Sequence, residues 1–264
     1  MQFELETVYT QKAVTAMARA LRKTIRKKKN RRSCIFGSII SFILLILVVF
    51  AIYFGSYYRA VDVESYLESS ENVTVLDEGD LVFKPTGEIK AGLIFYPGAK
   101  VEYTSYSPLM YELAKEGIMC VLVEMPLNFA IFGVDKAKDI MSDYDEISKW
   151  YLMGHSLGGA MIASFAGENS ENVAGLILLA AYSTTDVSSI DTLLIYGSND
   201  LVLNKEKYEE CKKNLSDSFI ESIIIGGNHA NFASYGKQKS DGEATISIDE
   251  QIDLTVQSII GFIS

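Results

Sequence analysis

The sequence is poor in the residues that form cross-links and metal sites, with three cysteines and two histidines among its 264 residues. The cysteines, at positions 34, 120 and 211, follow neither a disulfide framework nor a metal-binding spacing. Internal repeats and low-complexity segments are lacking as well. These absences argue against a disulfide-stabilised module, a metal-binding module and a repeat protein, and the sequence implies no metal and no organic cofactor.

Charge is absent from residues 34–54, which are almost entirely apolar. A helix of about 20 such residues spans roughly 30 Å, the hydrocarbon thickness of a bilayer, so this stretch is predicted to be a transmembrane helix. A cleaved signal peptide is the main alternative. It is disfavoured because no site of small residues suited to cleavage follows Phe54.

The net charge of -10 hides a basic N-terminus, since residues 1–32 contain ten Lys or Arg and two acids. Basic flanks of membrane helices stay in the cytoplasm, so the sequence predicts a single-pass cell-membrane protein with a cytoplasmic N-terminus. Its C-terminal part is then expected on the extracytoplasmic side. Membrane lipid is the partner expected for the basic run, because attraction to anionic lipid is a simpler explanation than nucleic-acid binding.

Residues 1–33 are predicted to form a basic amphipathic segment, because Val14, Met17, Leu21 and Ile25 recur at helical spacing between Lys and Arg. Residues 55–72 are predicted to be a connector, polar for most of its length. Whether Cys34, at the membrane boundary, is acylated is left open by the sequence.

Residues 73–264 alternate between predicted strands and predicted helices. The strands are expected at 73–76 and 81–83 (a hairpin), then at 91–96, 118–123, 150–153, 173–180, 192–196 and 220–225. The helices are expected at 107–115, with Ser107 as N-cap, and at 134–141, 157–166, 205–215 and 250–262. This pattern predicts an α/β fold with a mostly parallel sheet, helices on both faces, and ligands beyond the carboxyl ends of the strands.

One segment carries a strong chemical signal. Gly154, Ser156 and Gly158 form a G-x-S-x-G pattern between a predicted strand and a predicted helix. Glycines at these places let neighbouring backbone pass close to a strained turn, and the helix N-terminus favours negative charge developing there. Ser156 is therefore the predicted nucleophile.

A serine hydroxyl needs a base, and only two histidines are available. His155 lies inside the turn, where its side chain is expected to point away from the catalytic pocket and to pack. His229 follows the last predicted strand and is the predicted general base.

The base in turn needs an acid that orients its imidazole. Asp200 follows the carboxyl end of strand 192–196 and is the predicted orienting acid. Asp186 and Asp191 are competitors, although Asp191 precedes its strand and so lies at the opposite edge.

Two backbone N–H groups are predicted to form an oxyanion hole. One belongs to Leu157, directly after the nucleophile. The other is assigned to Ala99 in the loop after strand 91–96, with Lys100 as the alternative.

Three further residues are candidates for the substrate pocket. Met125 and Phe129 would form a wall of an acyl pocket, unless this stretch packs on the sheet instead. Asn228, beside the base, would contact substrate or position its own loop.

The chain order of Ser156, Asp200 and His229, together with the turn and the Pro97-Gly98 loop, resembles the α/β-hydrolase family over residues 73–264. The likeness is closest to compact bacterial members grouped with dienelactone hydrolases and small esterases. A cysteine-nucleophile dienelactone hydrolase would have Cys in place of Ser156, so that substrate is not carried over.

The resemblance implies a serine hydrolase that cleaves carboxylic esters of small-molecule substrates through an acyl-enzyme, without a cofactor. The short segment between Ala180 and Asp191 leaves no room for a large cap domain. Two alternatives stay open: a catalytically silent binding module that keeps the fold, and an acyltransferase of the cell envelope.

Overall fold

The structure, a computed structural model, describes the backbone of residues 2–264 and the side chains of residues 12–27 and 39–264. The chain divides into two compact units, Met1–Gly55 and Ser56–Ser264. Each unit is described by itself.

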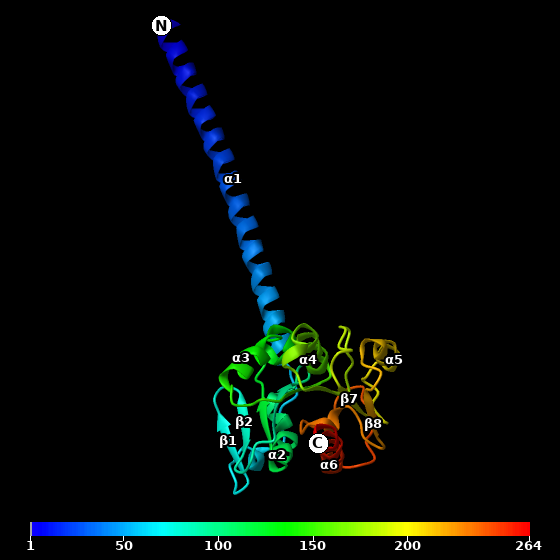
Figure 1. Ribbon diagram of the computed structural model, residues 1–264. Helices are drawn as coiled ribbons and strands as arrows, with labels where there is room; N and C mark the ends of the chain where they lie inside the picture. The colour runs from blue at the N-terminus through cyan, green and yellow to red at the C-terminus, as the bar shows by residue number, and fades with distance from the viewer. Residues whose placement is uncertain (1) are drawn as a thin grey trace. The chain divides into compact units, whose positions relative to one another are not determined.

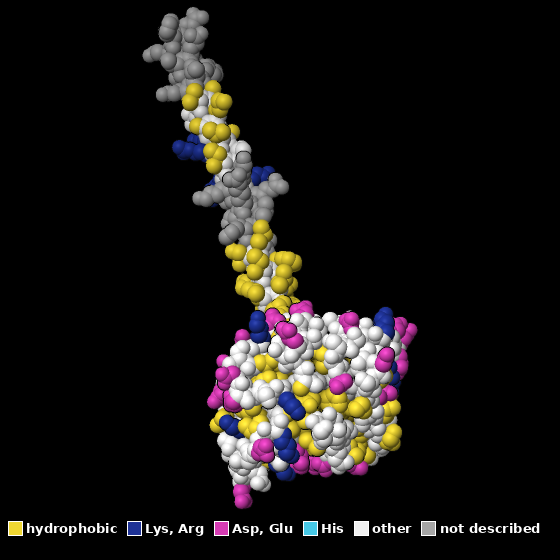
Figure 2. Space-filling view, viewed as in Figure 1, with side chains coloured by type: hydrophobic (Ala, Val, Ile, Leu, Met, Phe, Trp, Pro, Cys, Tyr) yellow, Lys and Arg dark blue, Asp and Glu magenta, His cyan; other side chains and the backbone are white. Residues whose placement is uncertain are grey.

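The first unit is a single helix, α1 (Gln2–Gly55). Val14, Met17, Leu21 and Ile25 lie in this helix, and their side chains are exposed. Hydrophobic side chains also surround the later described part of the helix (Figure 2). Where side chains are described, no helix has an apolar segment of the length required to cross a membrane. The side chains of residues 34–38, in the predicted anchor, lie outside the described residues.

The second unit is built on an eight-stranded sheet in the order β1-β2-β4-β3-β5-β6-β7-β8. The strands are β1 (Val73–Asp77), β2 (Leu81–Pro85), β3 (Ala91–Tyr96), β4 (Ile118–Leu122), β5 (Trp150–His155), β6 (Gly175–Leu179), β7 (Thr192–Gly197) and β8 (Ile220–Ile224). The predicted hairpin is confirmed, since β1 and β2 pair antiparallel, and β2 is also antiparallel to β4. The other neighbouring strands are parallel, as predicted.

Helices cover both faces of this sheet (Figure 1). One hydrophobic core lies beneath α2 (Ser107–Lys115) and α6 (Ile248–Ile263). The other lies beneath α3 (Lys136–Asp143), α4 (Leu157–Glu168) and α5 (Lys205–Cys211). Successive side chains of strand β3 point to opposite faces of the sheet and so enter both cores. Leu93 and Phe95 lie in the first core, and Ile94 and Tyr96 lie in the second.

Short 3-10 helices complete the unit. They are η1 (Glu64–Tyr66), η2 (Tyr103–Tyr106), η3 (Pro126–Asn128), η4 (Ala130–Phe132), η5 (Ser170–Asn172), η6 (Lys212–Asn214) and η7 (Ala230–Phe232). The N-cap predicted at Ser107 is wrong, because η2 runs directly into α2 and places Tyr106 at the cap position. The Ser107 hydroxyl is instead buried without a hydrogen-bond partner.

The residues expected to form a connector pack on the second unit. Tyr58 forms a parallel bridge with Val101, and its N–H donates to the carbonyl of Lys100 at 2.7 Å. Val63 is buried. This segment is therefore an ordered extension of the domain at the end of β3.

The turn from β5 to α4 is packed so closely that it tolerates no side chain at two of its glycines. A Cβ on Gly158 would lie 2.1 Å from the carbonyl oxygen of Tyr96, and one on Gly154 would lie 2.6 Å from the Gly158 carbonyl carbon. Both contacts are with backbone, which cannot move aside without displacing β3 or α4.

Gly158→Ala is expected to lower the free energy of unfolding by about 3 kcal/mol or more, because the added methyl group overlaps the end of β3. Gly87→Ala is the matched control: its Cβ would meet nothing within 4 Å, so a change of at most about 0.5 kcal/mol is expected. Denaturant unfolding followed by the fluorescence of Trp150, the single tryptophan, measures both. Equal stabilities of the two variants would contradict the close packing of this turn.

Candidate active site

Three parallel strands end at one edge of the sheet and bring the predicted site residues to it. Ser156 follows β5 directly, Asp200 lies three residues after β7, and His229 lies five residues after β8. Because β5, β7 and β8 run in the same direction, these residues share the carboxyl-terminal edge.

Ser156 occupies a strained conformation between β5 and α4. Its φ is 52° and its ψ is -122°, a region that non-glycine residues rarely adopt. Its N–H donates to the carbonyl of Leu179 at 2.9 Å, and its carbonyl accepts from Ala160 in the first turn of α4. The strain is thus held by backbone hydrogen bonds on both sides of the serine.

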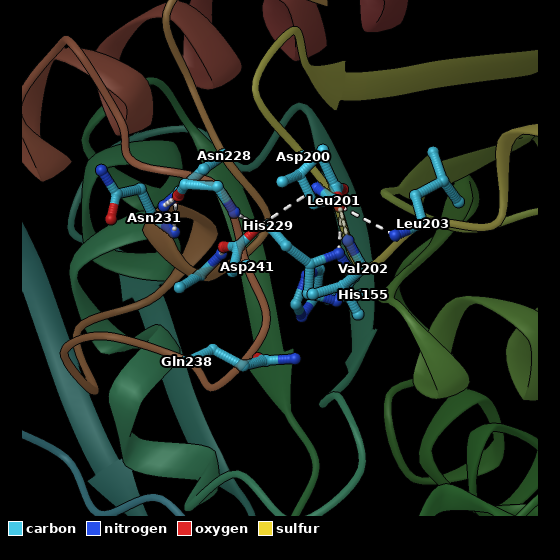
Figure 3. A network of polar contacts seen from close by, with 12 residues as sticks. His155, Asp200, Leu201, Val202, Leu203, Asn228, His229, Asn231, Gln238 and Asp241 are labelled. Atoms are coloured by element: carbon cyan, nitrogen blue, oxygen red, sulfur yellow. Dashed lines mark hydrogen bonds and ion pairs between the residues drawn. The ribbon is translucent and has the colours of Figure 1, made fainter.

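His229 and Asp200 form a buried pair. The Nδ1 of His229 lies 2.9 Å from Oδ2 of Asp200, and the two residues are 2% and 0% exposed. The other carboxylate oxygen, Oδ1, accepts from the N–H groups of Val202 and Leu203, each at 2.8 Å (Figure 3). With Nδ1 donating to the carboxylate, Nε2 of the neutral imidazole is left as an acceptor.

Ser156 and His229 are brought to the same edge of the sheet. Among the described residues, no hydrogen bond joins the Ser156 hydroxyl to the imidazole. In unliganded hydrolases such bonds are often long and tighten when substrate binds.

The loop that carries His229 is fixed by two side chains that sequence reasoning missed. Gln251 of α6 accepts from the N–H of Asn228 at 3.0 Å and donates to its carbonyl at 2.8 Å. Asp241 accepts from the N–H of Ala230 at 2.9 Å (Figure 3). The backbone is therefore held on both sides of the imidazole.

The predicted pocket residues differ in their surroundings. The amide of Asn228 donates to the carbonyl of Gly242 at 2.8 Å, and its oxygen accepts from the N–H of Asn231 at 3.0 Å. Of the two roles considered for Asn228, these contacts correspond to positioning its loop. Met125 is buried in the core beneath α3 and α4. Phe129 is half-buried, with its ring centroid 6.3 Å from that of Phe132.

The loop after β3 leaves one N–H available for an oxyanion. The N–H of Gly98 donates to the hydroxyl of Tyr106 at 3.0 Å, and that of Lys100 donates to the carbonyl of Asn128 at 2.8 Å. The N–H of Ala99 has no hydrogen-bond partner among the described residues. Of the two candidates in this loop, the hydrogen bonding thus favours Ala99 over Lys100.

Tyr106 links this loop to His155, another contact that the sequence did not reveal. Its buried hydroxyl lies 2.8 Å from Nδ1 of His155, whose ring centroid is 4.5 Å from that of His229. His155 is buried, as its packing role required, but its ring lies against the predicted base. With fifteen tyrosines in the chain, nothing in the sequence marks Tyr106.

Within the described part of the chain, no group of three or more His, Cys, Asp or Glu side chains is placed to hold a metal ion.

The pKa of His155 lies well below the ordinary value because burial disfavours its charged form, and the neighbouring His229 lowers it further. The unfolded chain, with an ordinary histidine pKa of about 6.5, therefore binds a proton that the folded chain does not. Folding stability from this group is complete above the unfolded value and is lost as the pH falls below about 6.5.

We expect the free energy of unfolding to decrease between about pH 7 and pH 5, and His155→Gln, which cannot titrate, to make that decrease smaller. Denaturant unfolding of both proteins at the two pH values measures the difference. If the pH dependence were the same in both, His155 would not be a buried neutral group.

A model of the "Alpha/beta hydrolase family" matches residues 92–253. No curated protein gives a significant match.

Three solved structures illustrate the similarity of fold. A dienelactone hydrolase from Anabaena variabilis is 16% identical, with a TM-score of 0.54, covering 72% of this chain and 99% of its own. A monoacylglycerol lipase from Paleococcus ferrophilus is 12% identical, with a TM-score of 0.53 and coverage of 72% and 98%. A soluble variant of monoglyceride lipase from Saccharomyces cerevisiae is 9% identical, with a TM-score of 0.53 and coverage of 75% and 96%. At such identities the likeness concerns the fold alone, but the family match extends over more than half of the sequence. The chain belongs to the α/β-hydrolase family.

Proposed function

We propose that this protein is a membrane-anchored serine hydrolase that cleaves carboxylic esters, with Ser156 as nucleophile, His229 as general base and Asp200 as orienting acid. The observation that carries the proposal is the buried 2.9 Å contact between His229 and Asp200, at the sheet edge where Ser156 stands on its strained turn. Family membership and the dienelactone hydrolase and monoglyceride lipases of similar fold support ester hydrolysis.

In the acylation step, Oγ of Ser156 attacks the ester carbonyl carbon while its proton passes to Nε2 of His229. The carbonyl oxygen becomes an oxyanion. The bond to the leaving oxygen then breaks, and His229 delivers the proton to that oxygen, which releases the alcohol and leaves an acyl group on Ser156.

Water completes the reaction. His229 takes a proton from the water molecule as its oxygen attacks the acyl carbon, and it returns that proton to Ser156 when the acid departs. Asp200 stays ionised throughout and stabilises the imidazolium that forms in each half-reaction. Its two backbone donors, at Val202 and Leu203, keep the carboxylate oriented for this role.

We assign the stabilisation of the oxyanion to hydrogen bonds from the backbone N–H groups of Leu157 and Ala99. Leu157 is the first residue of α4, so its N–H is one of those that a helix leaves without an internal partner. Ala99 supplies the second donor from across the edge. Loss of one such donor typically costs about 3 kcal/mol of transition-state stabilisation.

The substrate class is a small-molecule ester that reaches an uncapped site. Between Leu179, the end of β6, and Thr192, the start of β7, the structure has only turns and irregular backbone. Phe129 is half-buried on the loop that is hydrogen-bonded to the oxyanion loop (residues 97–100), and it is the residue we associate with the acyl side of the site. Met125 is buried in the core beneath α3 and α4, which corresponds to packing on the sheet.

The anchor is assigned to residues 34–54, with residues 1–33 in the cytoplasm and the hydrolase domain outside. The absence of charge in this stretch and the ten basic residues before it support this topology.

A fluorophosphonate probe is expected to label the wild-type protein, and Ser156→Ala is expected to abolish labelling and lower ester turnover by about a thousandfold or more. Ser218→Ala, at an exposed serine beside the opposite edge, is the matched control and is expected to label normally. Labelling that survives Ser156→Ala would reject the nucleophile, and an unlabelled wild-type protein would favour a silent binding module. Transfer of the acyl group to added alcohol in preference to water would identify an acyltransferase.

Protease treatment of intact cells is expected to digest the hydrolase domain and to leave an epitope on the basic N-terminus protected. Cells permeabilised before treatment are the control, in which both should be digested. A domain protected in intact cells, with an accessible N-terminus, would mean the opposite orientation.

A further inference from the structure

We propose that the catalytic edge of the hydrolase domain works against the bilayer surface, and that the natural substrate is an ester lipid residing in that bilayer. This inference rests on the proposed function, because it takes the Ser156 site as the active site and residues 34–54 as the anchor. It is carried by the place at which the chain enters the domain and by the side chains exposed around that place.

The chain enters the hydrolase domain at the catalytic edge. The backbone of Tyr58 is hydrogen-bonded on both sides, since its N–H donates to Lys100 at 2.7 Å and its carbonyl accepts from Glu102 at 2.8 Å. Lys100 directly follows Ala99, and Glu102 lies two residues further on. We call residues 56–61 the tether. Its hydrogen bonds at Tyr58 are therefore made beside Ala99, in the oxyanion loop.

Tyr58 is also joined to the segment that follows His229. Its hydroxyl accepts from the N–H of Lys239 at 3.1 Å, and its ring centroid lies 5.3 Å from that of Tyr235. Three residues later, the N–H of Val61 donates to the carbonyl of Ser234 at 2.9 Å. We call residues 225–247, which carry His229 between β8 and α6, the base loop. The tether is thus fixed between the oxyanion loop and the base loop.

Only Ser56 and Tyr57 separate Gly55, the last residue of α1, from Tyr58. Three residue steps of extended chain span at most about 10 Å. Whatever angle the helix takes, its end stays within that distance of Tyr58, and the catalytic edge cannot move far from the bilayer that the anchor enters.

Apolar side chains are exposed on the loop that lies beside this attachment point. The loop of η3 and η4 is bonded to the oxyanion loop through the N–H of Lys100 and the carbonyl of Asn128. On it, Leu127 is 52% exposed, Ile131 55% and Phe132 53%. Leu127 has a φ of 56°, a conformation that is unfavourable for leucine, so the loop holds backbone strain while presenting an apolar side chain to the outside.

The same loop packs through η4 against α4, the helix that begins immediately after Ser156. Near the acid, Leu201 directly follows Asp200 and is 71% exposed. We call Leu127, Ile131, Phe132 and Leu201 the apolar rim. Its members border the catalytic edge at the carboxyl ends of β4 and β7.

A bilayer is the occupant that these observations favour over a second copy of the chain. The tether keeps the rim within reach of lipid in every molecule, whereas a second copy would have to be recruited. Exposed apolar side chains beside a membrane helix gain by entering the boundary between headgroups and acyl chains. Arg59, exposed next to Tyr58, adds a positive charge suited to lipid phosphates.

The substrate class follows from this placement. In a bilayer the ester carbonyls of lipids lie at the boundary that the rim would enter, and no cap domain stands between that boundary and Ser156. A lipid ester would therefore reach the nucleophile by moving sideways or slightly outward, without leaving the membrane for water.

The activity test uses the full-length protein in phosphatidylcholine vesicles with two fluorogenic esters that share one leaving group. 4-Methylumbelliferyl oleate partitions into the bilayer, and 4-methylumbelliferyl acetate stays in water. In the double variant Leu127→Ser/Ile131→Ser, the ratio of the oleate rate to the acetate rate is expected to fall about tenfold, because two apolar contacts with lipid are lost. Ile220→Ser is the matched control, since Ile220 is 51% exposed but begins β8 at the opposite edge, and its ratio should not change.

The outcomes separate this inference from the proposed function. If the acetate is cleaved in a Ser156-dependent manner but the ratio does not change in the double variant, the bilayer inference is wrong and the hydrolase stands. If both rates fall in parallel, the rim acts on folding or on the site itself, and the inference is again wrong. If neither ester is cleaved by the wild-type protein and it resists the fluorophosphonate probe, the proposed function fails.

A second measurement is independent of activity. Trp150, the single tryptophan, is buried at the start of β5, on the edge opposite the site. Brominated phosphatidylcholine is expected to quench the added fluorescence of Ile131→Trp and not that of Ile220→Trp. Emission from Ile131→Trp that is shifted to the blue but insensitive to bromine would mean that protein, such as a second copy, covers the rim and would overturn the proposal.

Discussion

The site depends on one buried hydrogen bond, between Nδ1 of His229 and the carboxylate of Asp200. A carboxylate removed from water is costly unless its lone pairs are satisfied. Here Oδ1 accepts from Val202 and Leu203, so Oδ2 is left for the imidazole alone. The parallel order of β7 and β8 makes this possible, because it ends two neighbouring strands at the same edge and brings their following loops together.

The base loop shows how the rest of the domain supports that bond. Gln251 reaches from α6 to both backbone groups of Asn228, and Asp241 reaches back to Ala230. Two polar side chains from later in the sequence therefore fix the backbone on either side of His229. A helix that covers one face of the sheet thus also holds a loop at its edge.

The sequence was informative where the signal is local. Apolar runs and helical spacing predicted the parallel sheet and every long helix of the domain, and the G-x-S-x-G turn with two later residues at strand ends indicated the site. Contacts between residues far apart in the sequence left no such signal. Three contacts were missed for this reason: Tyr106 with His155, Gln251 with Asn228, and Tyr58 with Lys100 of the oxyanion loop. In each pair the two residues are 23 or more positions apart. The error at Ser107 has a different, local origin, because a 3-10 helix directly before α2 moved the cap.

The close, tilted contact of the two imidazoles matters for the charge that forms in the proposed reaction. In the proposed mechanism, His229 accepts the serine proton, and a positive charge then appears on a ring whose centroid lies 4.5 Å from that of His155. A second charge there would repel it and weaken the base at the moment it is needed. Since burial keeps His155 uncharged, the imidazolium of the proposed mechanism forms without a second positive charge beside it, although two histidines lie in contact.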